Sequence, residues 1–571
     1  MIERIRQYFI LDDSQLKLYL LAVVTGLLAG GVIVLFRLTI TTTQLHLIPS
    51  GEIEGFSSLP WTWILGLPVL SGLLIGLIFG RLSSEERSIG VVHIIERLSY
   101  HEGRLPWRNA VLQFFGSALA LISGHSVGRE GPSVHLGAAS GSILGANLDL
   151  PNNSVRVLVA AGSAAAIAAS FNTPIAGVIF AMEVIMMEYH IATFIPIILA
   201  SVSGTVINRL VFGEEHFFGQ LAAEMHSLWE IPYIIFLGIL LGFIATFFIH
   251  CLKYFSNFLA EHSLWKRTTL AGVLVGLGGL IMPDVMGMSS HITNSSIIAE
   301  MTVASLLLLL FLKLILSSAC IGLGIPGGLI GPTMIIGAIA GAILGIIGNY
   351  FFPDLSSSTG FYAMIGMCAM MGATIKAPLA ALMALLELTA NPHIIMPGML
   401  AIVFSSIIVS DLFKQDFIFL SLLRARGLDY RNDPISQTLR RISVSKAMQR
   451  NFVILPEEIS REGAKHALSS SPLWIIVQQD TTPTSLLPAS DLARAVAEQN
   501  IDVINLFKIP ASRQNLVKAS LHDSLQEAQD ILNKNNAEAL YISRVTAPMI
   551  ERTYGILTRQ AIESYYQVPK N

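Results

Sequence analysis

Two glycine- and proline-containing blocks of this sequence each occur twice, about 200 residues apart. The block Gly128-Arg-Glu-Gly-Pro-Ser-Val-His-Leu-Gly-Ala138 aligns with Gly328-Leu-Ile-Gly-Pro-Thr-Met-Ile-Ile-Gly-Ala338 at an offset of 200. The block Ser170-Phe-Asn-Thr-Pro-Ile-Ala-Gly-Val-Ile-Phe-Ala-Met-Glu183 aligns with Thr374-Ile-Lys-Ala-Pro-Leu-Ala-Ala-Leu-Met-Ala-Leu-Leu-Glu387 at an offset of 204. Blocks that recur in the same order predict a chain built from two structurally related halves. Two similar breaks in an ordinary helical bundle are the alternative.

The composition indicates that most of the chain lies in lipid. Of the 571 residues, 53% are hydrophobic and 13% are charged, whereas a soluble domain carries about 25% charged residues. Residues 431–571 hold 30 of the 75 charged side chains. We therefore predict an all-α multi-pass membrane domain over 1–430, with repeats at about 15–215 and 230–430, and a soluble domain over 440–571.

The apolar segments are broken in a way that favours a transport protein. Residues 110–205 contain six Asp, Glu, Lys or Arg side chains but also Pro132, Pro151 and Pro174. Non-helical backbone at membrane depth survives only where it is buried in protein or lines a wet cavity. Inverted-topology repeats with discontinuous helices are typical of transporters, whose binding site lies between the halves. The net charge of −3 offers no basic footprint for nucleic acid.

The distribution of basic residues predicts that both chain ends face the cytoplasm, because Lys and Arg accumulate on that side. Residues 41–60 contain neither residue, which places them outside. The segment from Met1 to Lys17 has no apolar core before a small-residue cleavage site, so we expect no removable signal peptide. The basic residues assigned to the cytoplasmic side are Arg4, Arg6, Lys17, Arg81, Arg87, Arg97, Arg104, Arg108, Lys253, Lys266, Arg267, Lys414, Arg424, Arg426 and Arg431.

The first block of each pair predicts a helix N-terminus that can hold an anion. Pro132 and Pro332 suit the first helical position, because that position needs no amide donor. Free amides and the helix dipole favour a negative guest, and glycines let the backbone approach it closely. The loop from Gly327 to Pro332 contains no charged side chain. It can therefore bind a small anion weakly enough for the anion to leave.

Glu130 stands at the start of the first predicted helix and can act as a gate. Its carboxylate would compete with a mobile anion for the same amides, so protonation or movement of the side chain would open the site. Capping of its own helix and pairing with Arg129 are the alternatives.

Other polar residues near the blocks favour structural tasks. Glu183 and Glu387 occupy matching positions, which favours hydrogen bonding to loop amides in both halves. His125 and His135 are expected to be packing or hydrogen-bonding residues. An intramembrane hydrolase using Ser126 or Ser133 with a neighbouring histidine is an alternative to transport, but nothing in the sequence orients such a pair with a third group.

No cofactor or metal site is expected from the motifs. The sequence contains no HExxH or Walker A motif. Its three cysteines, Cys251, Cys320 and Cys368, are too few and too scattered for a metal cage or a disulfide framework.

At the two blocks the sequence resembles the CLC family of chloride channels and chloride/proton exchangers. Gly128 to Pro132 is similar to the family's gating motif, and Gly327 to Pro332 is similar to its second anion-binding loop. Ala168 to Pro174, and Met371 to Pro378 followed by Leu386-Glu-Leu-Thr389, are similar to further family signatures. The resemblance covers roughly residues 15–430. It implies a homodimer with one anion path per subunit and an inverted repeat.

The resemblance also implies roles for single residues. Glu130 matches the external gating glutamate, and the amides of Leu329 and Ile330 match backbone anion ligands. The first anion-binding loop corresponds to Ile89 and Gly90, with Gly128 in the gating motif. Two positions depart from the family pattern, because Ile89 replaces a serine and Leu420 replaces a chloride-contacting tyrosine. Anion choice is then left to amides, so strict chloride preference is not implied.

A third departure concerns proton coupling. Family exchangers commonly place a proton-relay glutamate directly after the position matched by Glu183, and this sequence has Val184 there. Valine cannot carry a proton, and family channels share the substitution. We therefore expect chloride transport that is channel-like or weakly proton-coupled. The alternatives are a chloride/proton antiporter with a water-mediated proton path, or a carrier of another small anion such as fluoride or nitrate. The expected location is the plasma (cell inner) membrane.

The C-terminal region is expected to contain two α/β units. Asn451-Phe-Val resembles Asn515-Leu-Val at an offset of 64, and Trp474 to Val477 and Ala539 to Ile542 are predicted buried strands. The units resemble the paired CBS modules of many CLC proteins. Of a nucleotide-binding Gly-x-x-Thr-x-x-Asp pattern, Ser485 to Asp491 keeps only the aspartate, and Gly555 to Ala561 lacks it. A dimerising structural domain is favoured over nucleotide sensing.

Overall fold

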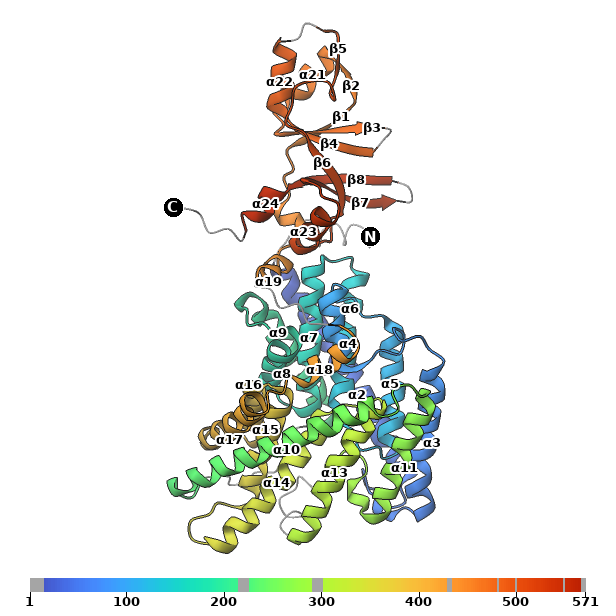
Figure 1. Ribbon diagram of the computed structural model, residues 1–571, viewed down its shortest axis with the longest axis vertical. Coiled ribbons are helices and arrows are strands. Elements are labelled where there is room, and N and C mark those ends of the chain that lie inside the picture. Colours follow the sequence, from blue (N-terminus) through green and yellow to red (C-terminus); the bar gives the residue numbers. More distant parts are fainter. Residues whose placement is uncertain are drawn as a thin grey trace. The chain divides into compact units, whose positions relative to one another are not determined.

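The computed structural model describes residues 15–213, 225–289, 301–428, 434–479, 482–498, 501–547 and 550–565. The chain divides into two compact units (Figure 1). A helical unit comprises residues 15–144 and 156–430. The described residues of a C-terminal unit fall in 145–155 and 434–565.

The helical unit is an all-α, multi-pass arrangement. Among the described residues, eight helical stretches are long and apolar enough to cross a membrane. Several others are too short, which confirms the prediction of broken helices. In chain order the helices are α2 (Gln15–Leu47), α3 (Trp61–Gly80), α4 (Gly90–Tyr100), α5 (Trp107–Ile122), α6 (Glu130–Asn147), α7 (Asn152–Phe171), α8 (Pro174–Phe180), α9 (Ile191–Phe212), α10 (Ile231–Asn257), α11 (Leu264–Ile281), α13 (Val303–Leu323), α14 (Ile330–Phe351), α15 (Thr359–Ile375), α16 (Pro378–Thr389), α17 (Ile395–Ile407) and α18 (Ile418–Ala425).

The two halves repeat the same helix breaks at the predicted offset. The chain bends between α7 and α8 at Asn172, with φ +60°, and between α15 and α16 at Lys376, with φ +48°. These positions are 204 residues apart, and neither is a glycine. Each is followed by a proline that begins the next helix, and proline is suited to that position.

The helix pairs preceding these breaks are also built alike. A Cβ atom on Gly137 of α6 would lie 2.3 Å from the carbonyl oxygen of Gly162 in α7. A Cβ atom on Gly337 of α14 would lie 2.3 Å from the carbonyl oxygen of Gly366 in α15. The backbones thus touch at matching points of the two halves, as small residues allow in membrane helices. The inverted repeat is therefore a property of the packing as well as of the sequence.

One predicted detail of the helix starts is wrong. We expected Pro132 and Pro332 at the first helical position, but α6 begins at Glu130 and α14 at Ile330, so each proline is the third residue. The first four amides of a helix lack intrahelical partners, so a proline is tolerated there as well. The consequence is that Glu130, the predicted gate residue, lies inside the first helical turn.

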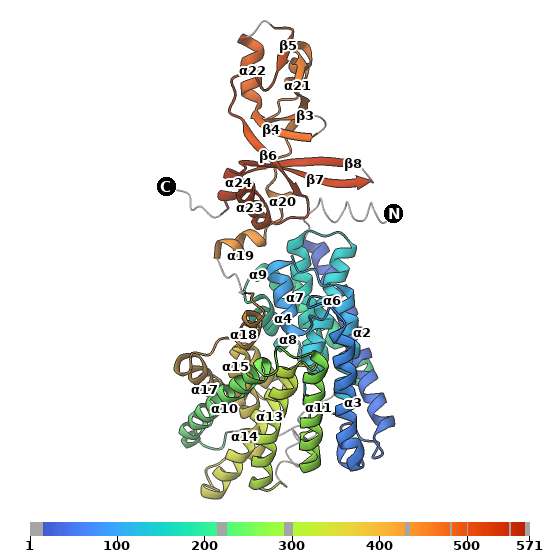
Figure 2. The same cartoon turned by 45° about the vertical axis from the view of Figure 1, so that its right-hand side comes forward.

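Other helices pack in pairs within and between the two halves. In Figures 1 and 2, α10 crosses α13, and α3 lies beside α11, pairs that are in contact. A large buried core runs through α2, α3, α5, α11, α13 and α14. The loops of the two first blocks lie next to this core, since Val127 and Ile325 belong to it.

The C-terminal unit confirms the prediction of two α/β units. Its six-stranded sheet has the order β1-β3-β4-β6-β7-β8. β1 pairs with β3, and β6 with β7, in parallel, while β3–β4 and β7–β8 are antiparallel. The first unit contains β1 (Phe452–Pro456), α21 (Arg461–Ser469), β3 (Trp474–Gln479), β4 (Thr482–Pro488) and α22 (Ala489–Glu498); the second contains β6 (Gln514–Ser520), α23 (Leu525–Lys534), β7 (Ala539–Ala547), β8 (Ile550–Thr558) and α24 (Arg559–Glu563).

The core of this unit begins before residue 440, where we expected the domain to start. Helix α19 (Pro434–Arg440) contributes Leu439 to one of its core clusters, which also contains residues of α23 and β7. A short two-stranded sheet of β2 (Glu458–Ser460) and β5 (Val503–Asn505) completes the unit.

Asp149 is the centre of a polar cluster in the C-terminal unit. Its carboxylate accepts a hydrogen bond from Arg544 at 2.5 Å and lies 3.2 Å from Nε2 of His522. The hydrogen bond and charge of His522, together with Arg544, lower the pKa of Asp149 from an ordinary 3.8 to about 2. The folded state therefore favours the ionised carboxylate.

We expect Asp149→Asn to lower the free energy of unfolding at neutral pH, and to lower it less in acid. Because the folded pKa is depressed, the contribution is complete above about pH 4 and is lost as the pH falls toward 2. With allowance for solvent screening of this half-exposed group, the loss at neutral pH is about 1 kcal/mol. Thermal unfolding of the two proteins between pH 2 and pH 7 measures it. A difference in melting temperature that does not shrink at low pH would contradict this account.

Candidate anion site

The two first-block loops are joined by a symmetric pair of backbone hydrogen bonds. The amide of Gly128 donates to the carbonyl oxygen of Gly328, and the amide of Gly328 donates to that of Gly128, both at 2.7 Å. A Cβ atom on Gly131 would lie 2.7 Å from the Cα of Gly328, so only glycine fits there. The pair brings the N-termini of α6 and α14 to one point between the repeats, where anions are favoured.

Glu130 occupies that point. Its side chain is fully buried, and Oε2 accepts a hydrogen bond from the amide of Gly331, in the first turn of α14, at 3.1 Å. Its Oε1 is buried without a hydrogen-bond partner among the described residues. The carboxylate thus lies on the N-terminus of the opposite half rather than only capping its own helix. Arg129, the alternative partner weighed above, donates to the carbonyl oxygen of Ser170 at 3.4 Å.

Of the predicted backbone ligands in the two first blocks, Leu329 and Ile330 have amides available for an anion, whereas Gly128 does not. Leu329 and Ile330 are buried beside Gly331, and their amides donate to none of the described residues. They can therefore serve an anion at the start of α14. The amide of Gly128 is already used by Gly328. Gly128 therefore joins the loops in this structure instead of offering a donor.

The positions that depart from the family pattern belong to two elements in contact, the start of α4 and α18. Gly90, with φ +79°, begins α4, and its amide donates to Oε1 of Gln113 at 2.7 Å. Ile89 precedes it and is half-buried. Leu420 is half-buried on α18, which packs against α4. Neither Ile89 nor Leu420 supplies a hydroxyl donor here.

Glu183 and Glu387 bind reciprocally across the repeats. Glu387 accepts from the amides of Ile175 and Ala176, at 2.8 and 2.7 Å. Glu183 accepts from the amides of Leu379 and Ala380, at 3.3 and 2.8 Å. Each carboxylate therefore caps the short helix, α8 or α16, of the opposite half. The prediction of a shared structural task is confirmed.

Val184 is fully buried in a π-helical turn, η2 (Ala181–Met186), that continues α8. One turn earlier, Phe180 lines a small apolar cavity of about 20 Å³. Ile330 and Thr173 also line this cavity. Thr173 Oγ1 is buried without a hydrogen-bond partner among the described residues. The cavity thus reaches from the start of α14 toward the turn that carries Val184.

Neither Ser126 nor Ser133 is hydrogen-bonded to a histidine among the described residues. His135 Nε2 lies 2.9 Å from His93 Nδ1, and His125 Nε2 lies 3.1 Å from Ser71 Oγ. Ser126 bonds with Ser317 at 2.9 Å, and Ser133 donates to the carbonyl oxygen of Arg129. The predicted hydrogen-bonding role of both histidines is confirmed, and the hydrolase alternative has no geometric support.

Two buried polar residues of the site were missed in the sequence. Gln113 on α5 holds Gly90, and Lys313 on α13 is fully buried near the site. Both stand alone in long apolar runs. A polar or charged side chain in such a run marks a function in a membrane protein, and that signal would have found them.

We expect Glu183→Ala and Glu387→Ala to lower stability to a similar extent. Each removes two charge-assisted hydrogen bonds to a helix N-terminus, which costs about 2–4 kcal/mol. Thermal unfolding of detergent-purified protein measures the loss, and Glu183→Gln and Glu387→Gln should each recover part of it. A large loss for one residue and none for the other would contradict the shared task.

Comparison with known proteins agrees with this geometry. A family model for voltage gated chloride channels matches residues 71–410. The H(+)/Cl(−) exchange transporter ClcA of Vibrio cholerae serotype O1 is 29% identical over 415 residues, covering 69% of this chain and 86% of ClcA.

Two solved structures share the fold. A slow cyanobacterial Cl−/H+ antiporter matches with a TM-score of 0.64 at 22% identity, over 72% of this chain and 97% of that chain. A eukaryotic CLC transporter matches with a TM-score of 0.59 at 18% identity, over 96% of this chain and 98% of that chain. Since the matching family model spans more than half of the sequence, the chain belongs to the CLC family of voltage-gated chloride channels and related transporters.

Proposed function

We propose that this protein transports chloride through a path that Glu130 gates. The observation that carries the proposal is the hydrogen bond from the Gly331 amide to Glu130 Oε2. A carboxylate at a helix N-terminus occupies the place of an anion, because both are attracted by the same amides and dipole. In this proposal the observed hydrogen bond is the closed state of the gate.

Opening follows from protonation or movement of the Glu130 side chain. A neutral carboxyl no longer competes strongly for the Gly331 amide. Chloride can then use the amides of Leu329, Ile330 and Gly331, without a cationic clamp that would slow its release. Acidic conditions should therefore increase flux.

We expect Glu130→Gln to make chloride flux insensitive to pH, since it mimics the protonated side chain. Glu130→Ala should act similarly by freeing the amides. Chloride efflux from liposomes between pH 4.5 and pH 7.5 measures this, with Glu188→Gln, outside the candidate site, as control. Retention of the original pH response by either Glu130 variant would place the gate elsewhere.

We propose channel-like or weakly proton-coupled transport because Val184 is buried and carries no proton. The alternative, a chloride/proton antiporter, is supported by a different observation. The cavity lined by Thr173, Phe180 and Ile330 has room for about one water molecule on the unpartnered Thr173 hydroxyl, and such a water can form one link of a proton path. The ClcA relative is named an exchange transporter.

A pH electrode on liposomes with an imposed chloride gradient distinguishes the two. We expect little uphill proton movement by the wild-type protein and more by Val184→Glu, which adds a titratable group beside Glu183. Val184→Gln, which is polar but does not carry a proton in this range, is the matched control. Steady proton movement driven by chloride in the wild type would establish the antiporter.

The anion is proposed to be chloride, with fluoride or nitrate as the alternative. Ile89 and Leu420 give no hydroxyl ligands, so selectivity depends on amides alone. One solved structure of this fold is a CLC-type fluoride/proton antiporter, with a TM-score of 0.56 at 21% identity. The same efflux assay with the three anions decides between them.

The assembly and location are proposed from the family resemblance. We infer a homodimer in the plasma (cell inner) membrane with cytoplasmic termini, and a C-terminal CBS-like pair that dimerises. The carboxylate of Asp491 accepts from the Ser512 amide at 3.0 Å, and Thr558 caps α24. These residues therefore have structural partners, which favours a structural domain over nucleotide binding.

A further inference from the structure

A short turn beside the gate is held by two charged side chains that the proposed function does not use. The turn consists of Val285 to Ser289, after α11, and its residues are buried. Gly287 has φ +62° and Ser289 has φ +61°, so the turn is sharply folded. Its Gly287 amide donates to the carbonyl oxygen of Gly124, in the loop that leads to Gly128.

Lys313 fixes this turn from one side. Its fully buried ammonium donates to the carbonyl oxygens of Val285 and Gly287, at 3.2 and 2.7 Å, and to Ser289 Oγ at 2.8 Å. These three bonds use all three ammonium protons. A buried charge is costly unless it is fully hydrogen-bonded, so the turn and Lys313 depend on each other.

Glu54 fixes the turn from another side. Its Oε1 accepts a hydrogen bond from the amide of Met288 at 2.7 Å. Glu54 is also close enough to interact electrostatically with Glu130, as Arg129 is, and with Lys313. Glu54 can therefore affect the gate in two ways, by its hydrogen bond to the Met288 amide and by its charge. Matched variants are needed to separate these two effects.

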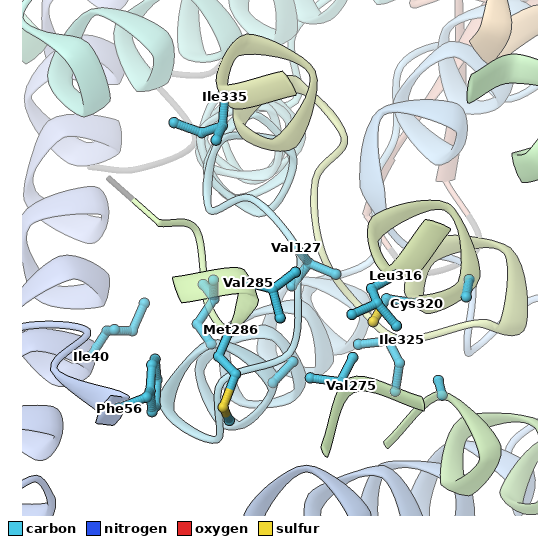
Figure 3. Packing of buried hydrophobic residues seen from close by; sticks show 14 of the residues in the cluster. Ile40, Phe56, Val127, Val275, Val285, Met286, Leu316, Cys320, Ile325 and Ile335 are labelled. Carbon is cyan, nitrogen blue, oxygen red and sulfur yellow. The ribbon is translucent and has the colours of Figure 1, made fainter. Parts of the chain in front are cut away.

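Met288 is the residue that the turn presents to the gate. A Cβ atom on Gly331 would lie 2.8 Å from Glu130 Oε2 and 3.1 Å from Met288 Sδ. The thioether and the gate carboxylate therefore pack on the same glycine, and Met288 is 7% exposed. Met286 in the same turn points elsewhere, to Gly124 and Gly279. Figure 3 shows Met286 near Phe56 in the hydrophobic core.

We propose that Met288 is the stop against which the closed Glu130 side chain rests, and that Lys313 and Glu54 are the positioning residues that keep it there. This inference rests on the proposed gating by Glu130. An apolar side chain at this place keeps water from one side of the carboxylate, which holds it on the Gly331 amide. Without Met288, water can hydrate the departing carboxylate and favour the open gate.

The first test compares two methionines of equal size in the same turn. The ratio of chloride efflux at pH 4.5 to that at pH 7.5 is measured in liposomes. We expect Met288→Ala to lower this ratio at least about threefold by raising flux at pH 7.5, because hydration of a carboxylate strongly favours its exposed state. Met286→Ala should keep the wild-type ratio, although it removes the same volume from the core.

The second test isolates the positioning role of Glu54. Glu54→Gln and Glu54→Ala both remove the charge, but only Gln retains an acceptor for the Met288 amide. We expect Glu54→Ala to lower the ratio below that of Glu54→Gln, with equal thermal stability of both proteins as the requirement for comparison. Met288→Ala added to Glu130→Gln should have no further effect, because the gate is already absent.

The outcomes separate this inference from the proposed function. An unchanged ratio for Met288→Ala, an equal change for Met286→Ala, or equal ratios for the two Glu54 variants would overturn the inference while leaving Glu130 as the gate. A Glu130→Gln protein that still responds to pH would instead overturn the proposed function.

Discussion

Helix N-termini that end inside the protein need an acceptor for their free amides. In this structure acidic side chains meet that need across the two repeats. Glu387 caps α8, Glu183 caps α16 and Glu130 reaches the start of α14. Water is scarce at membrane depth, so an uncapped N-terminus would be costly. The inverted repeat solves this by letting each half supply the acceptor for the other.

The sequence predicts the broken helices and their symmetry because glycine, proline and apolar runs act locally. The offsets of 200 and 204 residues return in the structure as matching contacts at Gly137 and Gly337 and matching bends at Asn172 and Lys376. The two α/β units of the C-terminal region follow for the same reason. By contrast, α6 begins two residues before Pro132, and not at Pro132 as the sequence predicts. The prediction fails here because a proline is compatible with any position of the first helical turn.

The partners across the repeats could not be predicted from the sequence. That Glu130 accepts from Gly331, or that Gln113 holds Gly90, depends on segments brought together by the fold. A lone polar residue in an apolar run indicates that it has a hydrogen-bond partner in the fold, but the sequence does not show which residue that partner is. Family resemblance identified Glu130, but it could not show that Gly128 is engaged by Gly328.

The three carboxylates differ in how firmly they are held, and this difference explains how one of them can be a gate. Glu387 receives two amide hydrogen bonds of 2.7 and 2.8 Å, one on each oxygen. Glu130 receives one of 3.1 Å from the opposite half, and its second oxygen has no hydrogen-bond partner among the described residues. A charge-assisted hydrogen bond contributes about 1.5–3 kcal/mol, so the second bond alone makes displacement of Glu387 far rarer. In the proposed mechanism, Glu130 is therefore the carboxylate that exchanges with an anion, while its counterparts hold the helices in place.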